Sequence, residues 1–199
     1  PMKENHPLNA QSPYAASKIS ADAMANAYFN SFKIPIAILR PFNNFGPRQS
    51  LRAIIPTIIT QYLNQKNKYI KLGNLNVTRD FTFVIDTVEA FVATINNKKI
   101  IGETINIGSN SEVSVKEITK LISSLTNIKK KIIVEKKRVR SEKSEVKRLN
   151  CCNLKAKKLL NWSPKYSGKK NFFNSLEKTL EWYKKPNNLK KFKSEIYNI

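Results

Sequence analysis

The chain of 199 residues contains only five glycines, two cysteines and one histidine. The glycines do not form a GxGxxG or GxxGxxG pattern, so the sequence lacks the usual glycine-rich loop for a dinucleotide pyrophosphate. Cys151 and Cys152 are adjacent, which strains a disulfide, and there is no CxxC pair. With a single histidine, a zinc site is not expected. We therefore predict no metal and a reducing compartment, the cytoplasm.

Long apolar runs are also missing. No stretch approaches the about 20 residues that a membrane-spanning helix needs. The first ten residues, PMKENHPLNA, show no charged-then-apolar signal pattern and begin with Pro1. We expect no membrane partner, and we interpret the sequence as a piece of a longer protein.

Acidic residues are scarce, and the formal net charge is +22 with a pI near 10.1. The excess is mostly lysine, spread among Asn and Ile, whereas the chain has seven arginines. Nucleic-acid readers favour clustered arginine with interleaved aromatics, so we predict a solvated lysine surface and no nucleic-acid partner. Two alternatives stay open: a basic module that binds nucleotide or nucleic acid without catalysis, and electrostatic attraction of a phosphorylated substrate.

Helix and strand patterns alternate along the chain, which predicts an α/β fold with a mostly parallel sheet. Ser12 and Pro13 mark a helix start by a hydroxyl cap and a first-turn proline. Asp86 with Glu89, and Ser114 with Glu117, have capping-box spacing. The predicted helices cover residues 13–32, 51–65, 87–95, 115–126, 154–160 (capped by Asn153) and about 170–184. The predicted strands cover 34–40, 69–73, 79–85, 103–108 and 131–137, with a loop at 41–49 and a short extended piece at 144–150.

Tyr14 and Lys18 lie four residues apart at the start of the first predicted helix, so they share one helix face. A free phenol is a poor base at neutral pH, but a nearby ammonium and the helix N-terminus favour the phenolate. The pair can therefore exchange a proton with a hydroxyl group. YxxxK is a weak pattern in a lysine-rich chain, and chance is the alternative.

Six stretches in register strengthen this interpretation. They are SPYAASKISAD (12–22), RPFNNFGPRQ (40–49), TRDFTFVIDTVEAF (78–91), ETINIG (103–108), RSEKSEV (140–146) and KAKKLLNWSPKYS (155–167). Together they resemble the extended short-chain dehydrogenase/reductase family, the NAD-dependent nucleotide-sugar epimerases and dehydratases. GPRQS (46–50), RAIIPTIITQ (52–61) and RSEKSEVKRL (140–149) are most similar to the nucleotide-sugar 4,6-dehydratases of the legionaminic-acid type.

The resemblance implies roles for individual residues. Tyr14 corresponds to the catalytic acid/base, and Lys18 to the lysine that lowers its pKa and binds the nicotinamide ribose. Pro41 corresponds to the backbone position against the nicotinamide. The remaining assignments concern the substrate: Asn43 and Arg79 hold its diphosphate, Arg140 reaches its nucleotide phosphate or ribose, and Arg48 and Arg52 line the same cleft. Where family members carry proline after the last arginine, this chain has Ser141.

The resemblance also implies an organisation. Residues 1–50 would end an NAD-binding Rossmann domain. Residues 51–185 would form mainly the smaller α/β substrate domain, with a Rossmann strand and helix interleaved near 79–110, and 186–199 a polar lysine-rich tail. The glycine-rich half would precede Pro1, together with the residues that separate dehydratases from epimerases.

The implied activity is oxidation of a nucleotide sugar at carbon 4, with NAD or NADP, followed by loss of water. A 4-epimerase is the alternative. The intact protein would be a homodimer in surface-polysaccharide biosynthesis, and the isolated chain would be inactive and expose an unpaired sheet edge.

Overall fold

The computed structural model describes residues 1–139, 141, 144–190 and 192. The helices are α1 (Pro13–Phe32), α2 (Ile54–Leu63), α3 (Val84–Val92), α4 (Val115–Thr126), α5 (Leu154–Leu160), α6 (Gly168–Lys184) and α7 (Pro186–Leu189), with short 3-10 turns η1 (Lys98–Ile100) and η2 (Lys136–Arg138). The strands are β1 (Ile38–Pro41), β2 (Asn43–Phe45), β3 (Tyr69–Leu72), β4 (Thr78–Phe83), β5 (Thr104–Ile107), β6 (Glu112–Ser114), β7 (Lys131–Val134) and β8 (Arg148–Leu149).

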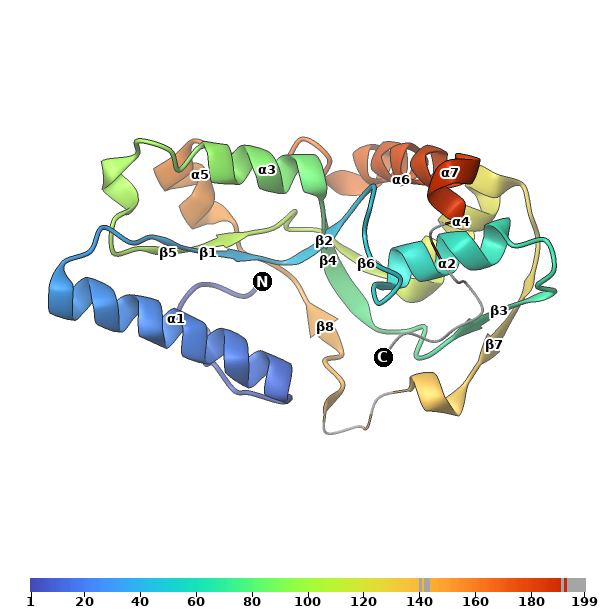
Figure 1. Cartoon of the computed structure of the whole chain (residues 1–199), viewed down its shortest axis with the longest axis horizontal. Helices are drawn as coiled ribbons and strands as arrows, with labels where there is room; N and C mark the ends of the chain where they lie inside the picture. The colour runs from blue at the N-terminus through green and yellow to red at the C-terminus, as the bar shows by residue number, and fades with distance from the viewer. Residues whose placement is uncertain (140, 142–143, 191, 193–199) are drawn as a thin grey trace.

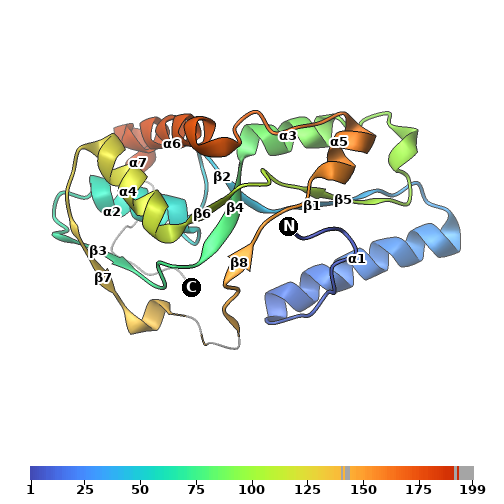
Figure 2. The ribbon, with the colours of Figure 1, turned by 180° about the vertical axis from the view of Figure 1, so that it is seen from behind.

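The strands form three groups, and most pairings are parallel, which confirms the predicted α/β class. β1 pairs with β5, and β3 with β7, both in parallel. β4 is the centre of the third group: β2 and β8 run parallel to it, and β6 runs antiparallel. Helix α1 lies on one face of the β1–β5 pair, and α3 and α5 lie on the other (Figures 1 and 2).

Two hydrophobic clusters hold these layers together. The larger cluster lies between β2, β4 and the helices α2, α4 and α6, and it includes Ile58, Ile118 and Leu176, all 0% exposed. The smaller one packs α3 and α5 on β5, with Ala156 and Trp162 among its members. Each fully buried aliphatic side chain contributes about 1.5–3 kcal/mol by transfer from water. Among the described residues, no helix has the length and apolarity needed to cross a membrane.

Local signals at two helix starts are confirmed. The Ser12 hydroxyl accepts the Ala15 N–H at 3.1 Å, with Pro13 at the first helical position. Ser114 and Glu117 form the predicted capping box at α4. Asn153 precedes α5, but its side chain donates to the Gly108 carbonyl at 2.9 Å rather than capping the helix.

The loop predicted at 41–49 is wrong in part, because Asn43–Phe45 is strand β2, paired in parallel with Phe81–Phe83. Its Asn and Gly content indicated a turn, yet pairing with β4 decides the conformation. The strand predicted at 34–40 begins later and ends one residue later, at Ile38–Pro41, and the helix predicted at 51–65 is shorter, Ile54–Leu63. The tail beyond Pro186 begins with the short helix α7.

The predicted capping role of Asp86 is wrong. Helix α3 already begins at Val84, and no side chain caps it. Asp86 is buried in the first turn, where its carboxylate accepts the backbone N–H groups of Lys165 and Tyr166, each at 2.9 Å. Burial raises the pKa of Asp86, against these two hydrogen bonds. The residue therefore anchors the segment before α6 to α3.

Asp80, on β4, makes a similar connection at the centre of the molecule. Its side chain is 0% exposed and accepts from the Ser109 N–H and hydroxyl, at 2.7 and 2.6 Å. It also accepts from the N–H groups of Asn110, at 2.8 Å, and Cys151, at 3.0 Å. Burial raises the pKa of Asp80, whereas these donors act to lower it. Because every partner donates, the group serves as a carboxylate acceptor joining β4 to the segments after β5 and β8.

We predict that Asp80→Asn destabilises the chain by about 3 kcal/mol, because an amide N–H₂ would face donors in a buried site. Urea unfolding at neutral pH measures this change. The matched control is Glu181→Gln, which removes an exposed pair with Lys184 and should cost no more than about 0.5 kcal/mol. Equal stability of the two variants would contradict the role given to Asp80.

The capping box at α4 should contribute to the free energy of unfolding in a pH-dependent way. The Ser114 hydroxyl, and secondarily its N–H, lower the pKa of Glu117. A depressed folded-state pKa stabilises the fold above the unfolded value, and this stabilisation is lost as the pH falls through the folded value. Glutamine keeps the box but not the charge, so Glu117→Gln should cost about 0.5 kcal/mol at neutral pH.

Urea unfolding at a series of pH values measures this difference. It should shrink as the pH falls below about 4, where the wild-type carboxyl is protonated too. A difference that is independent of pH would show that the Glu117 charge does not stabilise α4.

Candidate active site

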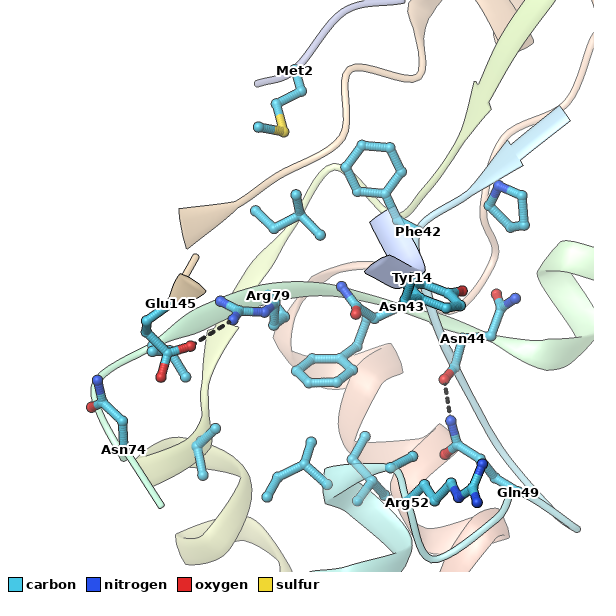
Figure 3. Close-up of a pocket in the computed structure, with 18 of the residues that line it drawn as sticks. Met2, Tyr14, Phe42, Asn43, Asn44, Gln49, Arg52, Asn74, Arg79 and Glu145 are labelled. Atoms are coloured by element: carbon cyan, nitrogen blue, oxygen red, sulfur yellow. Dashed lines mark hydrogen bonds and ion pairs between the residues drawn. The ribbon is translucent and has the colours of Figure 1, made fainter. Parts of the chain in front are cut away.

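A cleft of about 800 Å³ opens where the first residues of α1 meet the end of β1, strand β2, the first part of β4 and the start of α2. In parallel α/β sheets, ligands bind at the carboxyl ends of strands, and Pro41 and Phe42 lie at that end of β1. Figure 3 shows Arg79 and Glu145 on one side of the cleft, Asn44 and Gln49 on the other, and Asn43 between them. The walls thus carry both cationic and amide groups.

Five of the predicted site residues line this cleft: Tyr14, Pro41, Asn43, Arg52 and Arg79. Segments separated by up to 65 positions in the sequence supply them. Two others do not line it. Lys18 lies beside Tyr14 on α1, and Arg48 is exposed on the loop after β2, with a left-handed φ of 69°. Arg140 lies outside the described residues.

Tyr14 and Lys18 occupy the first two turns of α1, as their spacing predicted. The Lys18 Nζ atom lies 5.6 Å from the centroid of the Tyr14 ring. The Tyr14 side chain is 71% exposed, so its phenol is open to a ligand at the mouth of the cleft. A phenol with an ammonium at this distance can give or take a proton at a substrate hydroxyl.

Arg79, on β4, contributes a partly buried cation to the cleft wall. Side chains alternate along β4, so Asp80 faces the buried hydrogen-bond centre while Arg79 faces the cleft. The Arg79 side chain is 15% exposed; its Nη1 donates to the Thr78 carbonyl at 2.8 Å, and its Nη2 lies 3.5 Å from the Glu145 carboxylate. A guanidinium held in this way can bind two oxygens of an anionic group.

A hydrogen-bonded chain fixes the loop that follows β2. Thr87 donates to the Asn44 side-chain oxygen at 2.6 Å, and the Gln49 amide donates to the Asn44 carbonyl at 2.5 Å. The Tyr183 hydroxyl donates to the Gln49 carbonyl at 2.5 Å, and burial raises the pKa of Tyr183. These contacts connect the loop after β2, which lines the cleft, to α3 and α6.

Several residues that line the cleft were not predicted from the sequence: Arg40, Asn44, Gln49, Asn74, Arg138 and Glu145. Arg40, Asn44 and Gln49 lie in the same RPFNNFGPRQ stretch as Asn43, and Glu145 lies in RSEKSEV. Asn74 and Arg138 carry no local signal, because the parallel pairing of β3 with β7 brings them together. Arg138 also lines a second pocket of about 350 Å³ with Lys66, Lys68 and Lys71.

Comparison with known proteins assigns a family to this arrangement. The sequence profile described as GDP-mannose 4,6 dehydratase matches residues 1–172. The chain is 32% identical over 193 residues to the human dTDP-D-glucose 4,6-dehydratase, covering 91% of this chain and 51% of the relative. It is 31% identical over 190 residues to a putative UDP-glucose 4-epimerase of Methanocaldococcus jannaschii, covering 94% and 58%.

Solved structures agree with these matches. The epimerase Mth375 of Methanothermobacter thermautotrophicus has a TM-score of 0.84 at 30% identity, over 95% of this chain and 55% of that one. The UDP-glucuronic acid 4-epimerase of Bacillus cereus, solved with UDP-glucuronic acid and NAD, has a TM-score of 0.82 at 31% identity, over 92% and 56%. The chain spans about half the length of the curated relatives it matches. It belongs to the NAD-dependent epimerase/dehydratase family of extended short-chain dehydrogenases/reductases.

Proposed function

We propose that this chain supplies the substrate cleft and the proton-transfer pair of an NAD-dependent nucleotide-sugar dehydratase or epimerase. The observation that carries the proposal is the meeting of Tyr14, Asn43 and Arg79 in one cleft of about 800 Å³. A guanidinium that can bind an anion and a phenol that can transfer a proton, both lining one cleft, suit a sugar joined to a diphosphate. The relatives named above act on substrates of this class, as their names state.

Arg79 and Asn43 would bind the diphosphate, with Arg52 adding charge from the start of α2. Glu145 currently neutralises Arg79 at 3.5 Å. An incoming diphosphate carries more charge than this carboxylate, so it can displace Glu145 or share the guanidinium with it. Arg140 is proposed to bind the nucleotide on the strength of the family resemblance alone, and Arg48 has no cleft contact to support its proposed role.

Tyr14, with Lys18 beside it, would take the proton of the sugar hydroxyl as the carbon is oxidised, and would return it at the end of the cycle. The exposed Tyr14 and Lys18 and the exposed Pro41 at the end of β1 fit the nicotinamide end of NAD. NAD supplies a hydride acceptor when it is bound. The sequence contains no glycine-rich loop for the pyrophosphate of NAD, so the fit concerns the nicotinamide end only.

Within this class we propose a 4,6-dehydratase, supported by the dehydratase family profile and by the GPRQS and RSEKSEVKRL stretches. A 4-epimerase is the second candidate, supported by the epimerase relatives. We further propose cytoplasmic surface-sugar synthesis, the domain division at residues 50 and 185, and a homodimer through residues 19–29. Met24 and Tyr28 in that stretch are 63% and 48% exposed.

Binding of nucleoside diphosphates to the 199-residue chain tests the proposal. We expect Arg79→Ala to weaken binding of UDP, dTDP or GDP about 10- to 100-fold, because a charge-assisted hydrogen-bond pair to phosphate is lost. Isothermal titration calorimetry measures the change. Arg48→Ala is the matched control, since Arg48 is exposed and does not line the cleft, and it should bind as wild type does. Equal losses in both variants, or no binding by the wild type, would refute the proposal.

A further inference from the structure

Helix α1, which carries Tyr14, is held to the described part of the chain by unusually few contacts. None of its 20 residues is fully buried. The half-buried positions are Ala15, Ile19, Asp22, Ala25, Asn26 and Phe29, which form one helix face. Tyr14 and Lys18 flank this face. The contacts that fix the rotation of α1 therefore also fix the direction of the Tyr14 phenol.

One ion pair joins this face to the sheet. Arg40, on β1, places its Nε atom 2.6 Å from the Asp22 carboxylate, and each side chain is 23% exposed. The same guanidinium donates through Nη1 to the Glu4 carbonyl at 3.1 Å. Arg40 also precedes Pro41 and lines the cleft. It thus connects α1, the first residues of the chain and the strand that ends at the cleft.

The residues around Arg40 are themselves fixed. Asn106 lies opposite Arg40 in the β1–β5 register. Its N–H donates to the Glu4 carboxylate at 3.0 Å, and its amide donates to the Met2 carbonyl at 3.2 Å. Met2 in turn bridges to Cys151, beside the Asp80 centre. Through Asn106 and Met2, the contacts of Arg40 are therefore connected to the hydrogen bonds around Asp80.

A second contact lies seven residues further along α1. Gly102 has a φ of +82°, and a Cβ atom there would lie 2.6 Å from the Phe29 ring. Glycine thus allows Phe29 to pack directly on the backbone. Positions 22 and 29 lie about two turns apart on the same face, so these two contacts define both the tilt and the rotation of α1.

We propose that Arg40 and Asp22 are positioning residues that set the place of Tyr14 over the cleft. Each side chain of the pair is 23% exposed, so the pair is partly buried, and it can orient α1 as well as stabilise it. Phe29 lies 15 positions from Tyr14, whereas Asp22 lies eight positions from it, so the Asp22–Arg40 pair constrains the Tyr14 end of the helix more directly. The consequence for catalysis rests on the proposed function; the effect on the helix does not.

Distance measurement between spin labels tests this inference in the 199-residue chain. Nitroxides at Ser20→Cys on α1 and Asn76→Cys near the cleft occupy exposed positions, while Cys151 and Cys152 are buried and stay unlabelled. We expect one narrow distance in the labelled parent. Asp22→Asn and Arg40→Gln should each shift or broaden it, and Arg40→Lys, which keeps the charge, should restore most of the narrow peak.

The matched control is Lys155→Gln, which removes a 2.6 Å ion pair between α5 and Glu103. It should leave the distance unchanged. A purely stabilising role for Asp22 and Arg40 would lower the urea midpoint without changing the distance in the folded chain, and that result would overturn the inference.

Nucleotide affinity separates this inference from the proposed function. Asp22→Asn should bind UDP as tightly as the parent, because Asn43 and Arg79, which we propose bind the diphosphate, lie on β2 and β4 and not on α1. A parent that binds no nucleotide, with a distance that still broadens in Asp22→Asn, would refute the function and support the positioning role.

Discussion

The buried carboxylate of Asp80 is the interaction on which the arrangement of the cleft depends. It gathers N–H groups from the segments after β5 and β8 onto one strand, β4. Gly108 allows this approach, because a Cβ there would lie 2.3 Å from the Cys151 side chain. The neighbouring residue on β4, Arg79, is directed to the opposite face by the alternation of a strand. The same short strand therefore connects distant segments on one side and, on the other, carries the guanidinium that we propose binds the diphosphate.

The residues proposed to bind the substrate differ in how deeply their elements are buried. Near Arg79 and Asn43 lie the larger hydrophobic cluster and the hydrogen-bonded chain Thr87–Asn44–Gln49–Tyr183. Helix α1, which carries Tyr14, has no fully buried residue and makes contacts such as the Arg40 ion pair. The group proposed to bind the diphosphate therefore lies on the more buried element, and the group proposed to transfer the proton lies on the less buried one. Within the described residues, β1 pairs with β5 alone, so no other described strand pairs with its second edge.

Signals that act within one turn were predictable from the sequence. Ser12 with Pro13, and Ser114 with Glu117, each specify a helix start by contacts between near neighbours. The motifs around Tyr14, Asn43 and Arg79 predicted residues that do line one cleft. The capping prediction for Asp86 was wrong because a D-x-x-E pattern does not distinguish two roles. The aspartate can cap a helix, or it can accept N–H groups from residues 79 and 80 positions away, as it does here. Strand β2, Arg138 and the Arg40–Asp22 pair likewise depend on partners distant in sequence.

A crystal structure of the chain with a nucleoside diphosphate sugar would show directly where the phosphates bind. We expect a diphosphate bound by Arg79 and Asn43, with the sugar directed toward Tyr14 at the mouth of the cleft. Binding of the diphosphate in the second pocket, among Lys66, Lys68 and Lys71, would contradict it. That result would mean that the positive surface of the chain, and not the cleft built around β4, attracts the phosphates.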